Sequence, residues 1–157
     1  MAATSSKAPR SIVQLLGKRL STATVFFHAA IADRMGVTVT DAKCRSLLLQ
    51  HGPLSAGELA QRLGLTTGAV TGVIDRLTRA HWVMRVPDPV DRRRVTVHLA
   101  PHPKRDRDLE RFFEPMSKRI HALLAGYDRR EQECILEFVT KASEILEEET
   151  TRLRAKP

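Results

Sequence analysis

Three consecutive arginines, residues 92–94, follow Asp91 in a proline-containing stretch of the chain. Guanidinium groups bind phosphate oxygens and enter narrow minor grooves, where the potential is most negative. Asp91 stands two residues before Arg93, so its carboxylate can hold that guanidinium by a bidentate ion pair and fix its direction. A solvated basic loop is the alternative interpretation of such a charge run. The candidate contacts of this loop are Asp91, Arg92, Arg93 and Arg94.

A second set of polar residues lies just before these arginines and shares one face of a predicted helix. Apolar side chains recur at i, i+3, i+4 and i+7 from Val70 to Leu77, which is the spacing of an amphipathic helix. The opposite face begins with small residues, so its backbone can approach a major groove and a threonine methyl can touch a thymine methyl. The candidate groove contacts are Thr66, Thr67, Gly68 and Thr71, and the candidate phosphate contacts are Ser55, Arg76 and Arg79.

Two short helices joined by a tight turn are expected to position these side chains. Ser55 and Glu58 have the spacing of a capping box, in which each side chain accepts from the backbone N–H of the other. The helix that they open ends at Gly64, which can adopt a left-handed conformation, and Thr66 caps the second helix. An earlier helix, expected to open at Thr40–Asp41, would form the platform against which the first of these two helices packs. The order is that of a helix-turn-helix.

A two-stranded hairpin is predicted directly after the second helix. Residues 82–86 and 95–99 have the character of strands, and residues 87–94 form the turn between them. A hairpin in this position is a wing, with the arginines in its loop. The predicted fold class is mainly α with a small β-hairpin wing, in which a winged helix-turn-helix lobe is flanked by N- and C-terminal dimerisation helices.

These segments resemble the MarR (multiple antibiotic resistance regulator) family. Residues 88–99 are similar to the wing signature of that family, and residues 52–63 and 68–77 are similar to its two-helix pattern. The resemblance covers residues 39–99 at the level of motifs, whereas the flanking helices agree with the family in layout only.

The chain departs from the family pattern at three places. His81 stands where glycine is frequent, so the exit of the second helix is expected to be less tight. Thr67 and Gly72 stand where arginine or lysine is frequent, so few long side chains are expected to read base edges. Residues 100–103, Ala-Pro-His-Pro, replace the usual Thr and Gly before the next helix.

The resemblance implies a transcriptional regulator, expected to be a repressor, that binds a pseudo-palindromic site on double-stranded DNA as a homodimer. Its N- and C-terminal helices would interleave with those of the second copy. The chain is then divided into a disordered basic tail at 1–10 and one domain at 11–157, with the winged lobe at 39–99 and dimerisation helices at 11–35 and 104–154.

Two long amphipathic regions outside the winged lobe support a dimer. Apolar residues recur in steps of three and four from Ile12 to Met35, and a last helix opens at the capping-box pattern Asp128–Glu131. A compact winged lobe does not need these stripes for its own core, so a second copy is their expected partner. Pro115 lies inside the helix before the last one, where we expect a kink or short break near residues 111–115.

Aromatic residues of the terminal helices allow two interpretations. They are ordinary dimer core, or they line a pocket for a small aromatic or phenolic effector, which the family commonly binds between the dimer helices and the DNA-binding lobe. A histidine or an arginine beside apolar walls suits an anionic aromatic ligand. The candidate pocket residues are Arg19, Phe27, His28, Phe112 and Met116.

The composition limits the choice of partner. The 157-residue chain has a net charge of +8 and a sequence pI near 10.2, which favours a polyanionic partner. No apolar run approaches the ~20 residues that span a bilayer, and the first residues lack the apolar core of a signal peptide, so we expect a cytoplasmic protein without a membrane partner. Cys44 and Cys134 fall on the apolar sides of predicted helices, where buried thiols are expected.

Catalytic and metal-binding patterns are not found in the sequence. The six histidines do not form a cluster with ligand spacing, and there is no Gly-rich phosphate loop or nucleophile elbow. We therefore expect no enzymatic activity, no metal and no cofactor. Two alternatives to a sequence-specific regulator stay open: a non-specific or architectural DNA-binding protein, and a protein-interaction module without DNA binding.

Overall fold

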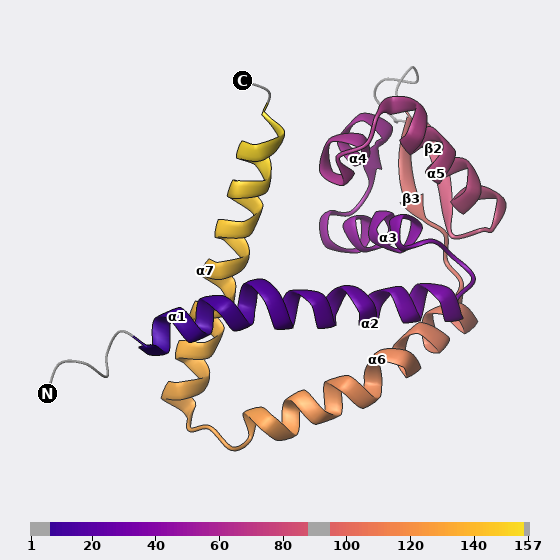
Figure 1. Ribbon diagram of the computed structural model, residues 1–157. Helices are drawn as coiled ribbons and strands as arrows, with labels where there is room; N and C mark the ends of the chain where they lie inside the picture. Colours follow the sequence, from indigo (N-terminus) through magenta and orange to yellow (C-terminus); the bar gives the residue numbers. More distant parts are fainter. Residues whose placement is uncertain (1–6, 88–94, 156–157) are drawn as a thin grey trace, which may run out of the picture. The chain divides into compact units, whose positions relative to one another are not determined.

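The structure is a computed structural model that describes residues 7–87 and 95–155 (Figure 1). The chain divides into two compact units, Met1–His102 and Pro103–Pro157, which are treated separately below. The first unit contains, in chain order, helix α1 (Lys7–Gln14), the π-helical segment η1 (Leu15–Leu20), α2 (Ser21–Arg34), α3 (Val39–His51), β1 (Leu54–Ser55), α4 (Ala56–Leu63), α5 (Thr67–Arg79), β2 (Val83–Pro87) and β3 (Val95–Leu99). The second unit contains α6 (Pro103–Leu124) and α7 (Arg129–Arg154).

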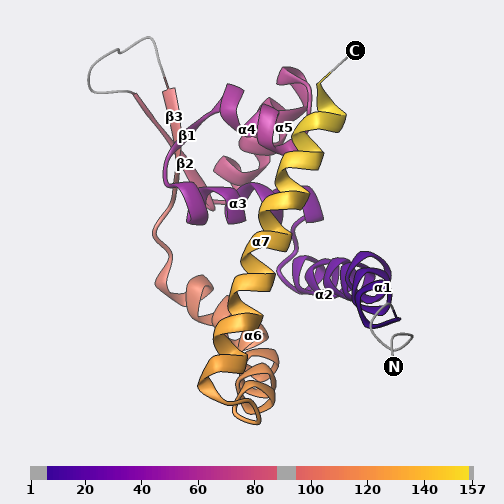
Figure 2. The ribbon, with the colours of Figure 1, turned by 90° about the vertical axis from the view of Figure 1, so that its left-hand side faces the viewer.

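Three helices and a small sheet form the core of the first unit. Helices α3, α4 and α5 pack on one another, and Figure 2 shows the sheet along one side of α4 and α5; Figure 1 shows the same part of the chain from another direction. The apolar face predicted for α5 is confirmed, because its residues from Val70 to Leu77 that follow the helical spacing are all buried. The most deeply buried side chains are Cys44, Leu59, Val70, Ile74, Leu77, Val83 and Val97.

The sheet has three antiparallel strands in the order β1-β3-β2, one strand more than the predicted hairpin. Strands β2 and β3 pair along their whole length, beginning with Val83 opposite Leu99. The additional strand β1 has two residues, and its Leu54 lies opposite Val97. A strand of two residues is too short to show an alternating pattern, so the sequence gives no signal for it.

Side-chain caps begin the helices that carry the winged part of the fold. Helix α4 begins at the predicted capping box, in which Ser55 Oγ accepts from the N–H of Glu58 at 3.2 Å and the Glu58 carboxylate accepts from the N–H of Ser55 at 2.8 Å. Helix α3 begins earlier than predicted, because Thr38 and Asp41 form a second capping box, with both distances 3.1 Å. This earlier start brings Asp41 into the first turn of α3.

Helix α5 ends in the same kind of turn as α4, although the residue type differs. At the end of α4 Gly64 adopts φ 68°, and after α5 His81 adopts φ 56°. The N–H of His81 donates to the carbonyl oxygen of Thr78 at 3.0 Å, and the N–H of Trp82 donates to that of Leu77 at 2.8 Å. This is the Schellman pattern of helix ends. The exit of α5 is therefore tight, contrary to the expectation that histidine would loosen it.

The N-terminal helical region differs from a regular helix in two respects. Helix α1 begins at Lys7, so residues 7–10 are helical and do not belong to a disordered tail. The segment η1 then interrupts the α-helical hydrogen-bond pattern from Leu15 to Leu20. Ile31 and Ala32 are the buried residues of α2. Most large apolar side chains before them are exposed, namely Ile12, Val13, Leu15, Leu20, Val25 and Phe26.

The second unit consists of two helices joined by a turn. Helix α6 runs without a break through Pro115, so of the expected kink or short break the break was wrong. The helix starts at Pro103, where the missing N–H of proline costs no helical bond. The capping box predicted at Asp128 and Glu131 is present at the start of α7. In residues 103–155, which the structure describes, no side chain is buried. This unit therefore has no apolar core of its own.

Candidate nucleic-acid interface

The first turns of α5 form an open face with short side chains. Thr66 caps the helix through its Oγ1, which accepts from the N–H of Ala69 at 3.3 Å. Thr71 Oγ1 donates to the carbonyl oxygen of Thr67 at 2.8 Å, so this hydroxyl lies against the helix backbone. A Cβ placed on Gly68 would meet no atom within 4 Å. The four residues predicted to contact a groove therefore lie together, exposed, on a surface that allows close approach of the backbone.

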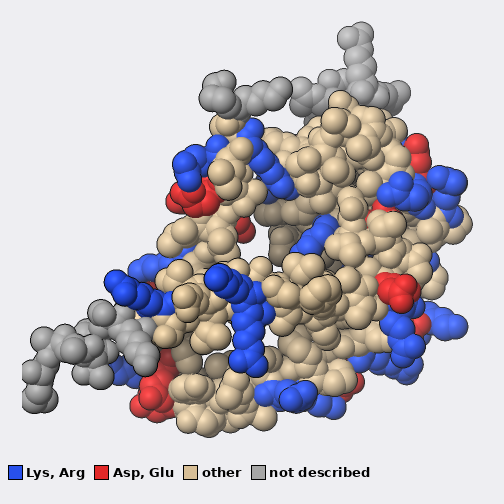
Figure 3. Space-filling view, viewed as in Figure 1, with Lys and Arg blue, Asp and Glu red and all other residues tan. Residues whose placement is uncertain are grey.

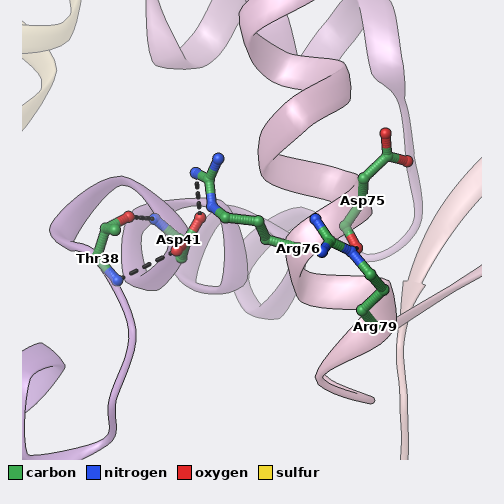
Figure 4. Close-up of polar contacts among 5 residues, drawn as sticks. All are labelled: Thr38, Asp41, Asp75, Arg76 and Arg79. Carbon is green, nitrogen blue, oxygen red and sulfur yellow. Dashed lines mark hydrogen bonds and ion pairs between the residues drawn. The ribbon is translucent and has the colours of Figure 1, made fainter.

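Arg76 points toward α3 and pairs with a buried carboxylate (Figure 4). Its Nη2 lies 2.9 Å from Oδ1 of Asp41, whose side chain is 5% exposed, whereas that of Arg76 is 47% exposed. Oδ2 of Asp41 accepts from the N–H of Thr38, so both carboxylate oxygens have partners. Among the described residues Asp41 is the one charged residue that is buried. The pair therefore ties the middle of α5 to the start of α3, a role that the sequence analysis did not assign to Arg76.

Asp75 connects the same helix to the sheet. Figure 4 shows its carboxylate pointing away from Asp41, and Oδ1 accepts from Nη2 of Arg85 in β2 at 2.7 Å. Arg79 is exposed, and its Nε donates to the carbonyl oxygen of Asp75 at 3.3 Å. Neighbouring residues of α5 thus make ion pairs with two different elements. Sequence analysis missed Asp75 and Arg85, because opposite charges ten positions apart give no sign of contact until the helix and strand are packed.

Ser55 is half-buried, and its polar groups belong to the start of α4. Its Oγ donates to the Glu58 carboxylate at 2.7 Å, in addition to the two bonds of the capping box. These hydrogen bonds from Ser55 hold the pKa of Glu58 below its usual value of 4.5. The arrangement fixes the position of Ser55 at the helix N-terminus, where backbone N–H groups are available to an anion.

The basic loop of the wing is bounded by described strands. Its predicted contacts, Asp91 and the arginines at 92–94, lie outside the described residues. The last pair of the hairpin before this loop is Pro87 opposite Val95. Thr96 Oγ1 also donates to the carbonyl oxygen of Val86 at 3.3 Å, which adds a side-chain bond to this end of the ladder.

The predicted effector residues are distributed over both units. Phe27 and His28 make an edge-to-face contact, with ring centroids 5.7 Å apart, and Nδ1 of His28 lies 2.8 Å from the carbonyl oxygen of Thr24. Arg19 is exposed on η1. Phe112 and Met116 lie on α6 in the second unit. The pocket therefore stays a prediction, since its two groups of residues belong to separately described units.

The two cysteines differ in their surroundings. Cys44 is buried in α3, and burial together with the nearby charge of Asp41 raises the pKa of its thiol to about 11. Cys134 is exposed on α7, so the prediction of a buried thiol was wrong for this residue. The sequence predicts Cys134 on an apolar stripe of α7, and the large side chains of this stripe are mostly exposed in the described part of the chain.

Charged side chains of both signs lie on the face of the molecule shown in Figure 3. On the face shown in Figure 3, acidic side chains lie next to basic ones, in agreement with the ion pairs described above. The residues that the structure describes contain no group of three His, Cys, Asp or Glu side chains that could hold a metal ion. None of the described helices is long and apolar enough to cross a membrane.

Helices α3–α5 with the three-stranded sheet have the architecture of a winged helix-turn-helix protein. The sequence model of the MarR family matches residues 37–95. The chain is 43% identical over 150 residues, 95% of each protein, to the HTH-type transcriptional regulator YcgE of Bacillus subtilis, which is named as uncharacterized. The chain belongs to the MarR family and is a transcriptional regulator; the regulators of this family are not enzymes.

Solved structures share this fold. The RV1404 protein of Mycobacterium tuberculosis superposes with a TM-score of 0.62 at 26% identity, over 89% of this chain and 93% of that chain. A mutant of MepR from S. aureus, solved bound to an oligodeoxyribonucleotide, superposes with a TM-score of 0.55 at 19% identity, over 85% of this chain and 97% of that chain. At this identity the MepR comparison shows the fold alone.

Proposed function

We propose that this regulator binds a pseudo-palindromic site on double-stranded DNA as a homodimer and represses transcription from the cytoplasm. The observation that carries the proposal is the exposed face at the start of α5, where all the side chains are short. Ion pairs from Asp75 and Arg76 hold this helix to the sheet and to α3. A helix whose orientation is fixed and whose exposed side chains are short can lie deep in a major groove.

Each predicted DNA contact has a role in this proposal. Thr66, Thr67, Gly68 and Thr71 approach base edges, while Ser55 and Arg79 contact phosphates. Arg76 pairs with Asp41 through one of its five N–H donors, so the others can bind a phosphate. Arg92, Arg93 and Arg94 contact phosphates or the minor groove, with Asp91 orienting the middle arginine.

Exposed apolar side chains support the homodimer. Helices α1, α2, α6 and α7 carry large apolar residues that are exposed in the single chain, and α6 and α7 bury none of their residues. Large apolar side chains exposed in such number are rare on a monomer and mark an interface. A two-fold dimer also places two α5 helices in successive major grooves, roughly 34 Å apart, which strengthens binding to DNA.

We also propose that a small-molecule effector controls DNA binding. A small aromatic or phenolic anion would bind between the dimerisation helices and the winged lobe, with Arg19 or His28 beside its charge and with Phe27, Phe112 and Met116 against its ring. The contact between Phe27 and His28 supports this assignment, because it places an aromatic face next to a titratable group. Release of DNA on binding would follow if the effector favours a different spacing of the two α5 helices.

A competition titration tests the DNA-binding part. The best duplex selected from a random pool competes with a scrambled duplex, and the titration is repeated with the flanks of the site changed to G·C. Because few long side chains reach base edges, we expect specificity toward the low end of the usual ~10³–10⁷ range, with A·T-rich flanks contributing much of it. Equal affinity for all duplexes would support an architectural protein, and absence of binding would support a protein-interaction module.

A further inference from the structure

A small cavity lies where α2, α3 and α5 meet in the first unit. Its volume is about 290 Å³, near the lower end of the range for small-molecule sites. The turn after α2 and the capped start of α3 form one wall, and the last turns of α5 form the other. The charged part of the lining is Asp33, Asp41 and Arg76, and the apolar part is Val37, Leu77 and Ala80.

The charged groups around this cavity favour a cation over an anion. Asp33 and Asp41 each supply a carboxylate, whereas Arg76 supplies the one guanidinium of the lining. The C-terminal end of α2 also reaches the cavity at Asp33 and the following turn, and a helix C-terminus adds partial negative charge. An anion that approached Arg76 would meet both carboxylates and this helix end.

The two carboxylates differ in their partners. Asp41 is 4% exposed and is held by the N–H of Thr38 and by Arg76. Asp33 is exposed, and within the described part of the chain its carboxylate makes no hydrogen bond or ion pair. A cation that enters the cavity therefore meets an available carboxylate at the rim and a second one, further inside, for which it competes with Arg76.

We propose that this cavity binds a small organic cation, in which an amidinium, guanidinium or ammonium group is attached to an apolar body. The cationic group binds Asp33 and competes for Asp41, while the apolar body packs against Val37, Leu77 and Ala80. Because Arg76 belongs to α5, occupancy changes how this helix is tied to α3. The site is distinct from the aromatic-anion pocket proposed above, and its existence does not depend on DNA binding.

Benzamidine and benzoate are suitable probes, because they share a planar ring and carry opposite charges. Isothermal titration calorimetry with the full chain at low salt is expected to show saturable binding of benzamidine and none of benzoate. Higher ionic strength should weaken the benzamidine signal, since the rim carboxylate is exposed. Preferential binding of benzoate, or binding of neither probe, would overturn the proposal.

Variants of two carboxylates locate the site. Asp33→Asn is expected to weaken benzamidine binding about tenfold, the effect of losing one hydrogen bond to a charged group. Asp75→Asn removes a carboxylate of the same unit that does not line the cavity, so it should leave the affinity for benzamidine unchanged. An unchanged affinity in Asp33→Asn, or an equal loss in both variants, would contradict the assignment.

Arg76→Gln provides a second measurement, which does not depend on Asp33 at the rim of the cavity. It leaves the Asp41 carboxylate buried without its cation, so the melting temperature should fall. Benzamidine should then raise the melting temperature of this variant more than that of the wild type, because it replaces the missing guanidinium in the native state. Arg79→Gln, three positions further along α5, is the control and should respond like the wild type.

If benzamidine raised the melting temperatures of the wild type, Arg76→Gln and Arg79→Gln equally, it would not reach Asp41. The proposed competition with Arg76 for this carboxylate would then be refuted. Anisotropy of a labelled duplex reports DNA binding separately. A chain that binds benzamidine but no duplex would refute the proposed regulator function and leave the cation site standing.

Discussion

His81 adopts a backbone conformation that histidine rarely takes. Its φ of 56° is imposed by the Schellman turn that carries the chain from α5 to β2. The turn persists because Leu77 and Trp82, the residues joined by its longer bond, are both buried. The position of the wing strand relative to α5 therefore depends on a strained residue at their junction.

Replacement of His81 by glycine should stabilise the protein. The fair comparison is between His81→Gly and His81→Ala, because both remove the imidazole and only glycine relieves the left-handed strain. We expect His81→Gly to be more stable than His81→Ala by about 1 kcal/mol in urea unfolding. At Ala80, whose φ is −84°, glycine should instead destabilise. If the His81→Gly variant were no more stable than His81→Ala, the backbone at position 81 would not be strained.

The two thiols should react at very different rates. Cys44 is buried and its pKa of about 11 leaves almost no thiolate at pH 8, whereas Cys134 is exposed. Iodoacetamide under native conditions should therefore modify Cys134 alone in a protein diluted below its association range. Intact-mass and peptide mass spectrometry measure the sites. Modification of Cys44 at a comparable rate in folded protein would show that α3 opens more readily than its packing indicates.

Helix α5 is held from two sides by adjacent residues of opposite charge. Asp75 pairs with Arg85 of β2, and Arg76 pairs with Asp41 of α3. In the Asp75–Arg85 pair both side chains are partly exposed, so this pair contributes little to stability. The Arg76–Asp41 pair contains a buried carboxylate, and removal of its arginine partner would be costly. The orientation of the helix is therefore fixed mainly from the α3 side.

The start of α4 should make a pH-dependent contribution to stability. The pKa of Glu58 is lowered by hydrogen bonds from Ser55, so the ionised form is favoured in the folded state. This contribution is fully present above the unfolded-state value of 4.5 and is lost as the pH falls through the lower folded-state value. Urea unfolding between pH 3 and 7 measures it. Glu58→Gln should reduce this pH dependence, whereas Glu147→Gln on α7 should leave it unchanged.

The loop of the wing should contribute to DNA affinity without contributing to stability. Arg93→Ala is expected to weaken duplex binding, to leave the melting temperature nearly unchanged, and to reduce the salt slope by about 0.9 for each phosphate contact removed. Asp91→Ala should weaken binding less, since it removes the carboxylate that orients Arg93 and keeps the positive charge of the arginine. Fluorescence anisotropy at several salt concentrations measures both variants. An unchanged affinity and slope in Arg93→Ala would mean that the loop is only a solvated charge run.

Local patterns and long-range contacts differed in how far the sequence predicted them. The capping boxes at Ser55 and Asp128 and the buried face of α5 follow from spacing within one turn or one helix, so they were predictable. The strand at Leu54 and the ion pairs of α5 depend on contacts between different elements, whereas the tight exit at His81 depends on the burial of Leu77 and Trp82 in the packed core. The partner of Arg76 is 35 residues away, and no periodicity marks it.

The exposed large apolar side chains are concentrated in the N- and C-terminal parts of the chain. The winged part encloses a core, while α1, η1, most of α2 and the second unit expose large apolar side chains. Burial of these side chains against a second copy would be favourable, because it is worth about 25 cal/mol for each Å² removed from water.

A homodimer should persist at low micromolar concentration. Light scattering is expected to give a mass near twice the 17.6 kDa of one chain. Leu146→Asp, which places a charge on the exposed apolar stripe of α7, should shift the equilibrium toward single chains. Thr140→Asp adds the same charge at an exposed polar position of α7 and is the control. A wild-type mass near that of one chain would reject the dimer.

The π-helical segment η1 has a consequence for the length of the chain. Each N–H in a π-helix bonds one residue further back than in an α-helix, so a turn holds about one residue more. Gly17, in the middle of this segment, has no neighbour within 4 Å of an added Cβ. Loss of one residue there would let a regular α-helical hydrogen-bond pattern run from Lys7 to Arg34. Evolution can therefore shorten the chain by one position at η1 without interrupting the helix.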